Sequence, residues 1–130
     1  MDNRDVAKGW FRKASNDRRN AEYVITMENP PTDTICFHCQ QSAEKYFKGF
    51  LALFGKETPK THDLEELISI CASIDPAFAS LRDMASELTD YAITVRYPVM
   101  GEEIPVEDAK DAIKKARAIE RFVLDRAPRS

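Results

Sequence analysis

The stretch CFHC, from Cys36 to Cys39, holds the residue types most often used for metal binding or redox chemistry. A structural zinc ion needs four ligands, usually from two separated pairs, and only His62 and Cys71 remain elsewhere in the chain. On a helix, residues 36 and 39 share a face, whereas residue 38 points roughly 200° away from residue 36. These three side chains do not readily bind one ion, so we expect no metal here.

Redox chemistry is also a poor match for this stretch. A thioredoxin-like CxxC normally follows a strand and begins a helix, whose dipole stabilises the thiolate. No strand pattern precedes Cys36. We therefore expect Cys36 and Cys39 to pack in the core as small apolar residues. No cofactor is indicated, and three cysteines in a chain of 130 residues are typical of reduced thiols in a cytoplasmic protein.

Polar residues capable of binding or catalysis follow directly on the same predicted helix. Glu44 and Lys48 have the i, i+4 spacing that favours a helix surface pair, and Gln41 and Lys45 lie close to them. Two interpretations stay open for these residues at this point. They form either a solvated edge of the helix or part of a functional site.

The elements that must position these residues are helices. Apolar residues recur at intervals of three and four along most of the chain, and only 4 glycines are present. Asn29-Pro30-Pro31 ends the first helix, and Gly55 is a natural residue to follow the second. Arg12, Lys13, Arg18 and Arg19 lie largely opposite the apolar face of the first helix. The expected helices are Asp5 to about Met27, Thr32 or Asp33 to Phe54, a short one from about residues 61–63, Asp75-Pro76 to before Pro98, and Val106 to Arg126.

Length, composition and the five expected helices indicate one all-α domain over residues 1–130, a compact helical bundle with short connections. Hydrophobic residues make up 43% and charged residues 32% of the chain, as in soluble globular proteins. The net charge is −3, so the whole protein lacks the basic field expected of a duplex-binding protein, although a local basic pocket is allowed. The polar N-terminus is not a signal peptide, and no apolar run is long enough to span a bilayer.

Three motifs in this order resemble the HEPN family, whose name stands for higher eukaryotes and prokaryotes, nucleotide-binding. QQSAEKYFKGFL, Gln40 to Leu51, is similar to the family's QxxExxxKxxL helix. HDLEEL, His62 to Leu67, resembles its HDLxxL segment, and Arg96-Tyr97-Pro98 resembles its R-Y-P signature after the long fourth helix. The resemblance covers about residues 5–125. It implies a five-helix up-and-down bundle that commonly forms a homodimer.

The resemblance also implies a functional setting. Small stand-alone HEPN proteins often accompany a minimal nucleotidyltransferase, in pairs that resemble toxin–antitoxin systems. Some branches are metal-independent RNases with a signature of arginine followed four to six residues later by histidine. Arg96 matches the arginine, but positions 100–102 are methionine, glycine and glutamate.

Cleavage of RNA without a metal needs a base for the 2′-hydroxyl and a cation for the phosphate. Arg96 can supply the cation, but no histidine follows it. His62 is a substitute base only if the start of the third helix lies against Arg96. Glu102 and Glu103 are further candidates, but ordinary carboxylates are weak bases at neutral pH.

Arg96 and Tyr97 are the leading candidates for a ligand site. Arginine at the end of a helix either completes the last carbonyls or offers planar donors to a phosphate. Tyr97 either packs on the end of the bundle or stacks on a base. Lys45, Lys48 and His62 are further candidates for binding a nucleotide or phosphate.

We therefore expect a non-catalytic HEPN-type protein, a cytoplasmic homodimer that binds a nucleotide or RNA phosphate and acts with a nucleotidyltransferase partner. Two alternatives remain open. One is a metal-independent RNase with Arg96 and a relocated base such as His62. The other is a purely structural module for dimerisation and partner docking, for which the first and fourth helices have wide apolar faces.

Overall fold

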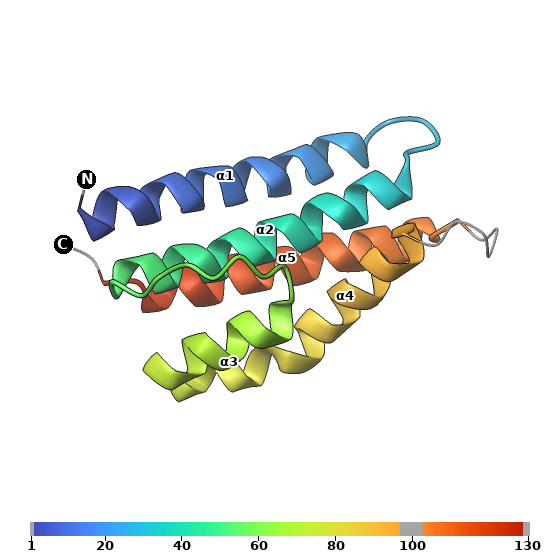
Figure 1. Ribbon diagram of the computed structural model, residues 1–130. Coiled ribbons are helices and arrows are strands. Elements are labelled where there is room, and N and C mark those ends of the chain that lie inside the picture. The colour runs from blue at the N-terminus through green and yellow to red at the C-terminus, as the bar shows by residue number, and fades with distance from the viewer. Residues whose placement is uncertain (1, 97–102, 129–130) are drawn as a thin grey trace.

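The computed structural model describes residues 2–96 and 103–128, apart from the side chains of residues 93–96. Within these residues the chain forms five α-helices and one 3-10 helix, and no strand. The predicted all-α, five-helix up-and-down bundle is confirmed (Figure 1). In chain order the elements are α1 (Asn3–Val24), α2 (Thr32–Leu53), α3 (Leu64–Ile74), η1 (Pro76–Leu81), α4 (Arg82–Arg96) and α5 (Val106–Arg126).

Local side-chain chemistry sets several of the helix ends. The Asp63 carboxylate accepts a hydrogen bond from the Glu65 N–H at 3.0 Å and begins α3, and Gly55 follows α2 with φ of 68°. The fourth helix differs from the expectation, because its first turns form the separate 3-10 helix η1. Asp75 accepts from the Ala77 N–H at 3.0 Å, and Pro76 cannot donate, so the chain starts with tighter turns before α4.

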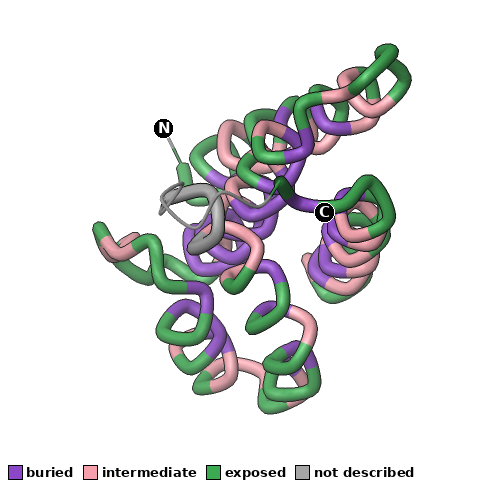
Figure 2. The backbone as a smooth tube through the Cα atoms, turned by 90° about the vertical axis from the view of Figure 1, so that its right-hand side faces the viewer, coloured by how far each residue is buried: buried purple, intermediate pink, exposed green. Residues whose placement is uncertain are grey.

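Helix α2 lies in the middle of the bundle. It packs against α1, α3, α4 and α5, so that nearly all of its circumference is covered (Figure 1). Figure 2 shows the buried parts of the helices turned toward the interior and the exposed parts outward. This central position explains why several polar residues of α2 are buried.

Small residues let α1 approach α2 closely. Ala7, Ala14 and Ala21 repeat every seven residues on the inner face of α1 and are buried. The Ser42 hydroxyl donates to the Ala14 carbonyl at 2.8 Å across the contact. Gly49 is required here, because a Cβ atom at this position would lie 2.4 Å from a ring carbon of Phe11.

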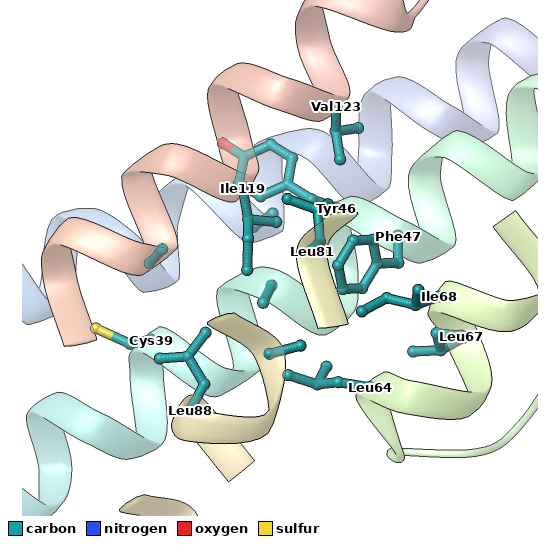
Figure 3. Close-up of a cluster of buried hydrophobic side chains, with 14 of the residues drawn as sticks. Cys39, Tyr46, Phe47, Leu64, Leu67, Ile68, Leu81, Leu88, Ile119 and Val123 are labelled. Carbon is teal, nitrogen blue, oxygen red and sulfur yellow. The ribbon is translucent and has the colours of Figure 1, made fainter. Parts of the chain in front are cut away.

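One hydrophobic core joins all the helices. Figure 3 shows Cys39, Tyr46 and Phe47 of α2 meeting side chains from α3, η1, α4 and α5. The rings of Phe47, Phe50 and Phe122 surround Phe78 of η1 with centroid distances of 4.5 to 6.3 Å. Among the described residues, no helix is both long enough and apolar enough to cross a membrane.

Candidate functional site

A buried ion pair lies at the centre of the polar residues of α2. Lys48 Nζ is 3.1 Å from Glu44 Oε2, and the two side chains are only 6% and 4% exposed. The i, i+4 spacing predicted the pair, but the interpretation as a solvated helix edge is wrong for these two residues. The neighbouring helix and the chain before α3 cover them. Trp10 of α1 lies over the Lys48 ammonium, with 5.6 Å between the nitrogen and the ring centroid.

His62 joins this cluster from the connection between α2 and α3. Its Nδ1 lies 3.0 Å from Glu44 Oε1 and 3.1 Å from Oε2, while its side chain is 68% exposed. The side-chain amide of Gln40 donates to the His62 carbonyl at 3.2 Å. These contacts fix the chain just before Asp63 caps α3. Glu44, Lys48 and His62 therefore hold the α2–α3 connection against α2.

Lys45 belongs to a second polar cluster, between α1 and α2. Its Nζ lies 2.6 Å from Asp17 Oδ2, and His38 Nδ1 lies 2.9 Å from the other oxygen of the same carboxylate. Asp17 is buried, so the two bases compensate a carboxylate that has lost most of its contact with water. Lys45 is thus positioned by Asp17, and His38 turns toward α1 and not toward the cysteines.

Arg96 is the last residue of α4. Its side chain lies outside the described part of the structure, as do Tyr97 and Glu102 in full. Ile104 is buried just before α5 begins, and Glu103 is exposed. In Figure 1, α4 ends at the far end of the bundle, well beyond the point where α3 starts. The sequence-predicted residues are thus divided among the end of α4, the Glu44 cluster and the Asp17 cluster.

A shallow cavity of about 340 Å³ lies between α4 and α5 and includes Glu87, Asp111 and Lys115 in its lining. Lys115 forms a close ion pair with Asp111, and its Nζ lies 2.7 Å from Glu87. The Tyr91 hydroxyl donates to Asp111 at 2.9 Å. Burial and this hydrogen bond raise the pKa of Tyr91 to about 12. Because Lys115 is held between two carboxylates, this cavity is a poor match for a phosphate.

The cysteines pack as predicted. Cys36, Cys39 and Cys71 are fully buried in the core. Burial raises the pKa of the Cys36 and Cys71 thiols to about 12, and it raises that of Cys39 further still. Thiols with such pKa values are poor nucleophiles and poor metal ligands near neutral pH. Over residues 2–96 and 103–128, no group of three or more histidine, cysteine or acidic side chains is arranged to hold a metal ion.

Sequence reasoning missed the buried carboxylate of the second cluster. Asp17 sits among polar residues of α1 and carries no burial signal in its own residue type. Its position is the signal that could have found it, because it lies three residues after Ala14 and four before Ala21. Both alanines are in the core, so Asp17 falls on the inner face of α1.

The glutamine that contacts the His62 connection was also missed. Gln41 was the expected glutamine of the α2 motif, but Gln40 makes the contact to His62. Gln40 lies one turn before Glu44, which is the spacing that brings both side chains to the same connection.

Comparison with known proteins agrees with the all-α fold and with the family resemblance. The model of the HEPN domain matches residues 7–126, and the chain therefore belongs to the HEPN family. The crystal structure of TT1696 from Thermus thermophilus is similar, with a TM-score of 0.73 and 25% sequence identity. The similarity covers 92% of this chain and 96% of that one. A search of curated proteins found no match.

Proposed function

We propose that this HEPN protein binds a nucleotide or an RNA phosphate at the end of α4 and does not itself cleave RNA. The observation that carries the proposal is the position of Arg96 as the last residue of α4, followed directly by Tyr97. The guanidinium offers planar paired donors to phosphate oxygens, and the phenol ring offers a face for stacking on a base. Both functions come from adjacent residues at one end of the bundle.

The contacts of the other candidates support this choice of residues. Lys48 and His62 both contact Glu44, and Lys45 contacts Asp17, so each has a carboxylate partner within the fold. A phosphate would have to displace these carboxylates to bind there. The proposal therefore assigns ligand binding to Arg96 and Tyr97, and a positioning role to Lys45, Lys48 and His62.

The proposal includes two partners. The chain forms a homodimer, which would bring two copies of the α4 end into one assembly, and it acts with a minimal nucleotidyltransferase in a pair that resembles a toxin–antitoxin system. Membership of the HEPN family supports both points. Co-expression with a nucleotidyltransferase encoded next to the chain tests the second. Co-elution through two chromatographic steps supports the pairing, and separate elution contradicts it.

A second candidate function rests on the geometry of His62. Glu44 holds Nδ1 of an imidazole that is otherwise largely exposed, which is how a carboxylate orients a histidine base. In this alternative, His62 is the relocated base of a metal-independent RNase and Arg96 of a second protomer binds the phosphate, because within one chain the end of α4 lies well beyond the start of α3 (Figure 1). Cleavage of a synthetic RNA in EDTA that is lost in His62→Ala supports it. Absence of cleavage by the purified dimer excludes it.

Thermal-shift titration tests the main proposal. The wild type and Arg96→Ala are compared in the presence of ATP, GTP, CTP, UTP and a short RNA. A ligand at 100 times its dissociation constant that binds only the folded state adds about 2.7 kcal/mol of stability. A saturable shift that is lost in Arg96→Ala supports the site. A flat response to every ligand favours the third possibility, a structural docking module.

A further inference from the structure

The outer face of α1 carries a row of positively charged side chains. Successive helical residues rotate by about 100°, so Arg4, Lys8, Arg12, Arg19 and Tyr23 fall within an arc of about 100°. All five side chains belong to exposed residues. The row spans about 28 Å along the helix. We call these five residues the α1 stripe.

The cations of the stripe are not neutralised within the fold. Over the part of the chain that the structure describes, no ion pair joins Arg4, Lys8, Arg12 or Arg19 to a carboxylate. This contrasts with Arg18 of the same helix, which contacts Glu22 one turn further along α1 and Glu120 of α5. In a chain with a net charge of −3, four unpaired cations on one face concentrate positive potential locally.

Helix α5 extends this positive surface beside the last turns of α1. Arg117 Nη2 lies 2.6 Å from Glu22 Oε2, which places this part of α5 next to the C-terminal part of α1. Arg117 and Arg121 lie one turn apart, and both are exposed. Glu22 is shared between Arg18 and Arg117, and this pairing lowers the pKa of its carboxyl group although burial opposes the change. Glu22 and Glu120 together offset Arg18 and Arg117, and the exposed Arg121 adds further positive charge to this part of the surface.

The exposed ring of Tyr23 gives this surface an aromatic contact that a purely charged patch lacks. Its side chain is 76% exposed, more than any other large hydrophobic residue that the structure describes as exposed. It ends the stripe at the end of the bundle where α4 also ends (Figure 1). An exposed aromatic ring beside a track of arginine and lysine suits stacking on an unpaired base while the cations follow the phosphates.

We propose that the α1 stripe, with Arg117 and Arg121, binds single-stranded RNA. A step of four residues, as from Lys8 to Arg12, advances about 6 Å along the helix. The flexible backbone of a single strand can follow cations at this spacing, and only unpaired bases offer a free face for stacking on Tyr23. Asp5 lies beside Arg4 and reduces the potential there, so binding is centred from Lys8 to Tyr23.

This surface is separate from the site proposed at Arg96, and the inference holds if Arg96 has no ligand. The test is fluorescence anisotropy with a labelled single-stranded RNA of mixed sequence and about 16 nucleotides, the upper end of known site sizes for single-strand binding folds. The variants are the double charge reversal Arg12→Glu with Arg19→Glu, and Tyr23→Leu. The matched control is Lys13→Glu, because Lys13 is an exposed residue of the same helix about 130° away from the stripe.

The double reversal should weaken binding by about tenfold or more, and should reduce the slope of log K against log salt by about 1.4, because two phosphate contacts are lost. Tyr23→Leu should weaken binding about fivefold or more. Lys13→Glu should change it by about twofold or less. Circular dichroism confirms that each variant is folded.

Three results would overturn the inference. Lys13→Glu changes the charge by −2 and the double reversal by −4, so a loss in Lys13→Glu about half as large on a logarithmic scale would reduce the effect to net charge. Loss of RNA binding in Arg96→Ala alone would move the RNA to the end of α4. Equally tight binding of duplex DNA of the same length, unaffected by Tyr23→Leu, would exclude the single-strand assignment.

Discussion

Lys48 and Glu44 form an ion pair of 3.1 Å whose two side chains are almost completely excluded from solvent. His62 reaches the same carboxylate from the connection before α3, and Trp10 of α1 covers the ammonium. The motif residues of α2 and of the HDLEEL segment thus meet in one cluster. Packing contacts between the two motifs therefore explain why both occur in this chain, and no ligand is needed to explain them.

The first prediction concerns the stability of this cluster. Glu44→Ala leaves the Lys48 ammonium buried without its partner, so unfolding free energy should fall by about 3–5 kcal/mol. The double variant Glu44→Leu with Lys48→Met removes both charges and should lose much less. Urea denaturation of the single and double variants measures the difference. If the two variants are equally destabilised, packing volume and not charge pairing explains the loss.

The second prediction concerns the close contact of α1 and α2. Gly49→Ala places a Cβ against the Phe11 ring, which also stacks on Tyr46 with a centroid distance of 5.9 Å, so the ring has to move. We expect a loss of about 1–3 kcal/mol. Gly9→Ala is the matched control, since no atom lies within 4 Å of its added Cβ. It should stabilise α1 by about 0.5–1 kcal/mol.

Chemical denaturation of the two alanine variants in parallel separates packing from helix propensity. Both substitutions lie inside helices and add one methyl group. A gain of stability at both positions would show that Phe11 relaxes without cost.

The third prediction concerns the thiols. Cys36, Cys39 and Cys71 should not react with a thiol reagent at pH 8 in the native protein, and all three should react after unfolding. Burial raises the pKa of Cys36 from 9.0 to about 12. The unfolded chain therefore ionises first as the pH rises. This contribution to stability is fully present below pH 9.0 and is lost between pH 9.0 and about 12.

Denaturation at a series of alkaline pH values measures that loss. Each buried thiol should contribute up to about 1.4 kcal/mol per pH unit within this window. Cys71→Ala should show a shallower decline than the wild type, since one such group is absent. Fast labelling of the native protein at pH 8 would instead indicate that the core opens readily.

The fold could be predicted largely from local signals. Asp63 and Gly55 are residues whose chemistry begins or ends a helix whatever surrounds them, and the structure uses both in this way. Burial of Cys36 and Cys39 followed from their place in the apolar series of α2. The division of the fourth helix into η1 and α4 was not predicted, because it depends on a few hydrogen bonds in the turns after Pro76.

The polar clusters could be predicted only in part. The spacing of Glu44 and Lys48 indicated a pair, but its burial depends on α1 and on the chain before α3, which are distant in sequence. Asp17 has no partner nearby in the sequence, since His38 and Lys45 lie more than 20 residues away on another helix. Tertiary contacts decide such burial, and no single-helix pattern contains them.

The central claim is that Arg96 binds phosphate at the end of α4, and isothermal titration with ATP tests it most directly. The variants are Arg96→Ala and Arg96→Lys, which keeps the charge but loses the planar fork. Arg82→Ala is the control, because Arg82 begins the same helix at its other end. We predict that Arg96→Ala abolishes binding, Arg96→Lys weakens it and Arg82→Ala leaves it unchanged. Wild-type affinity in a folded Arg96→Ala protein would contradict the proposed site.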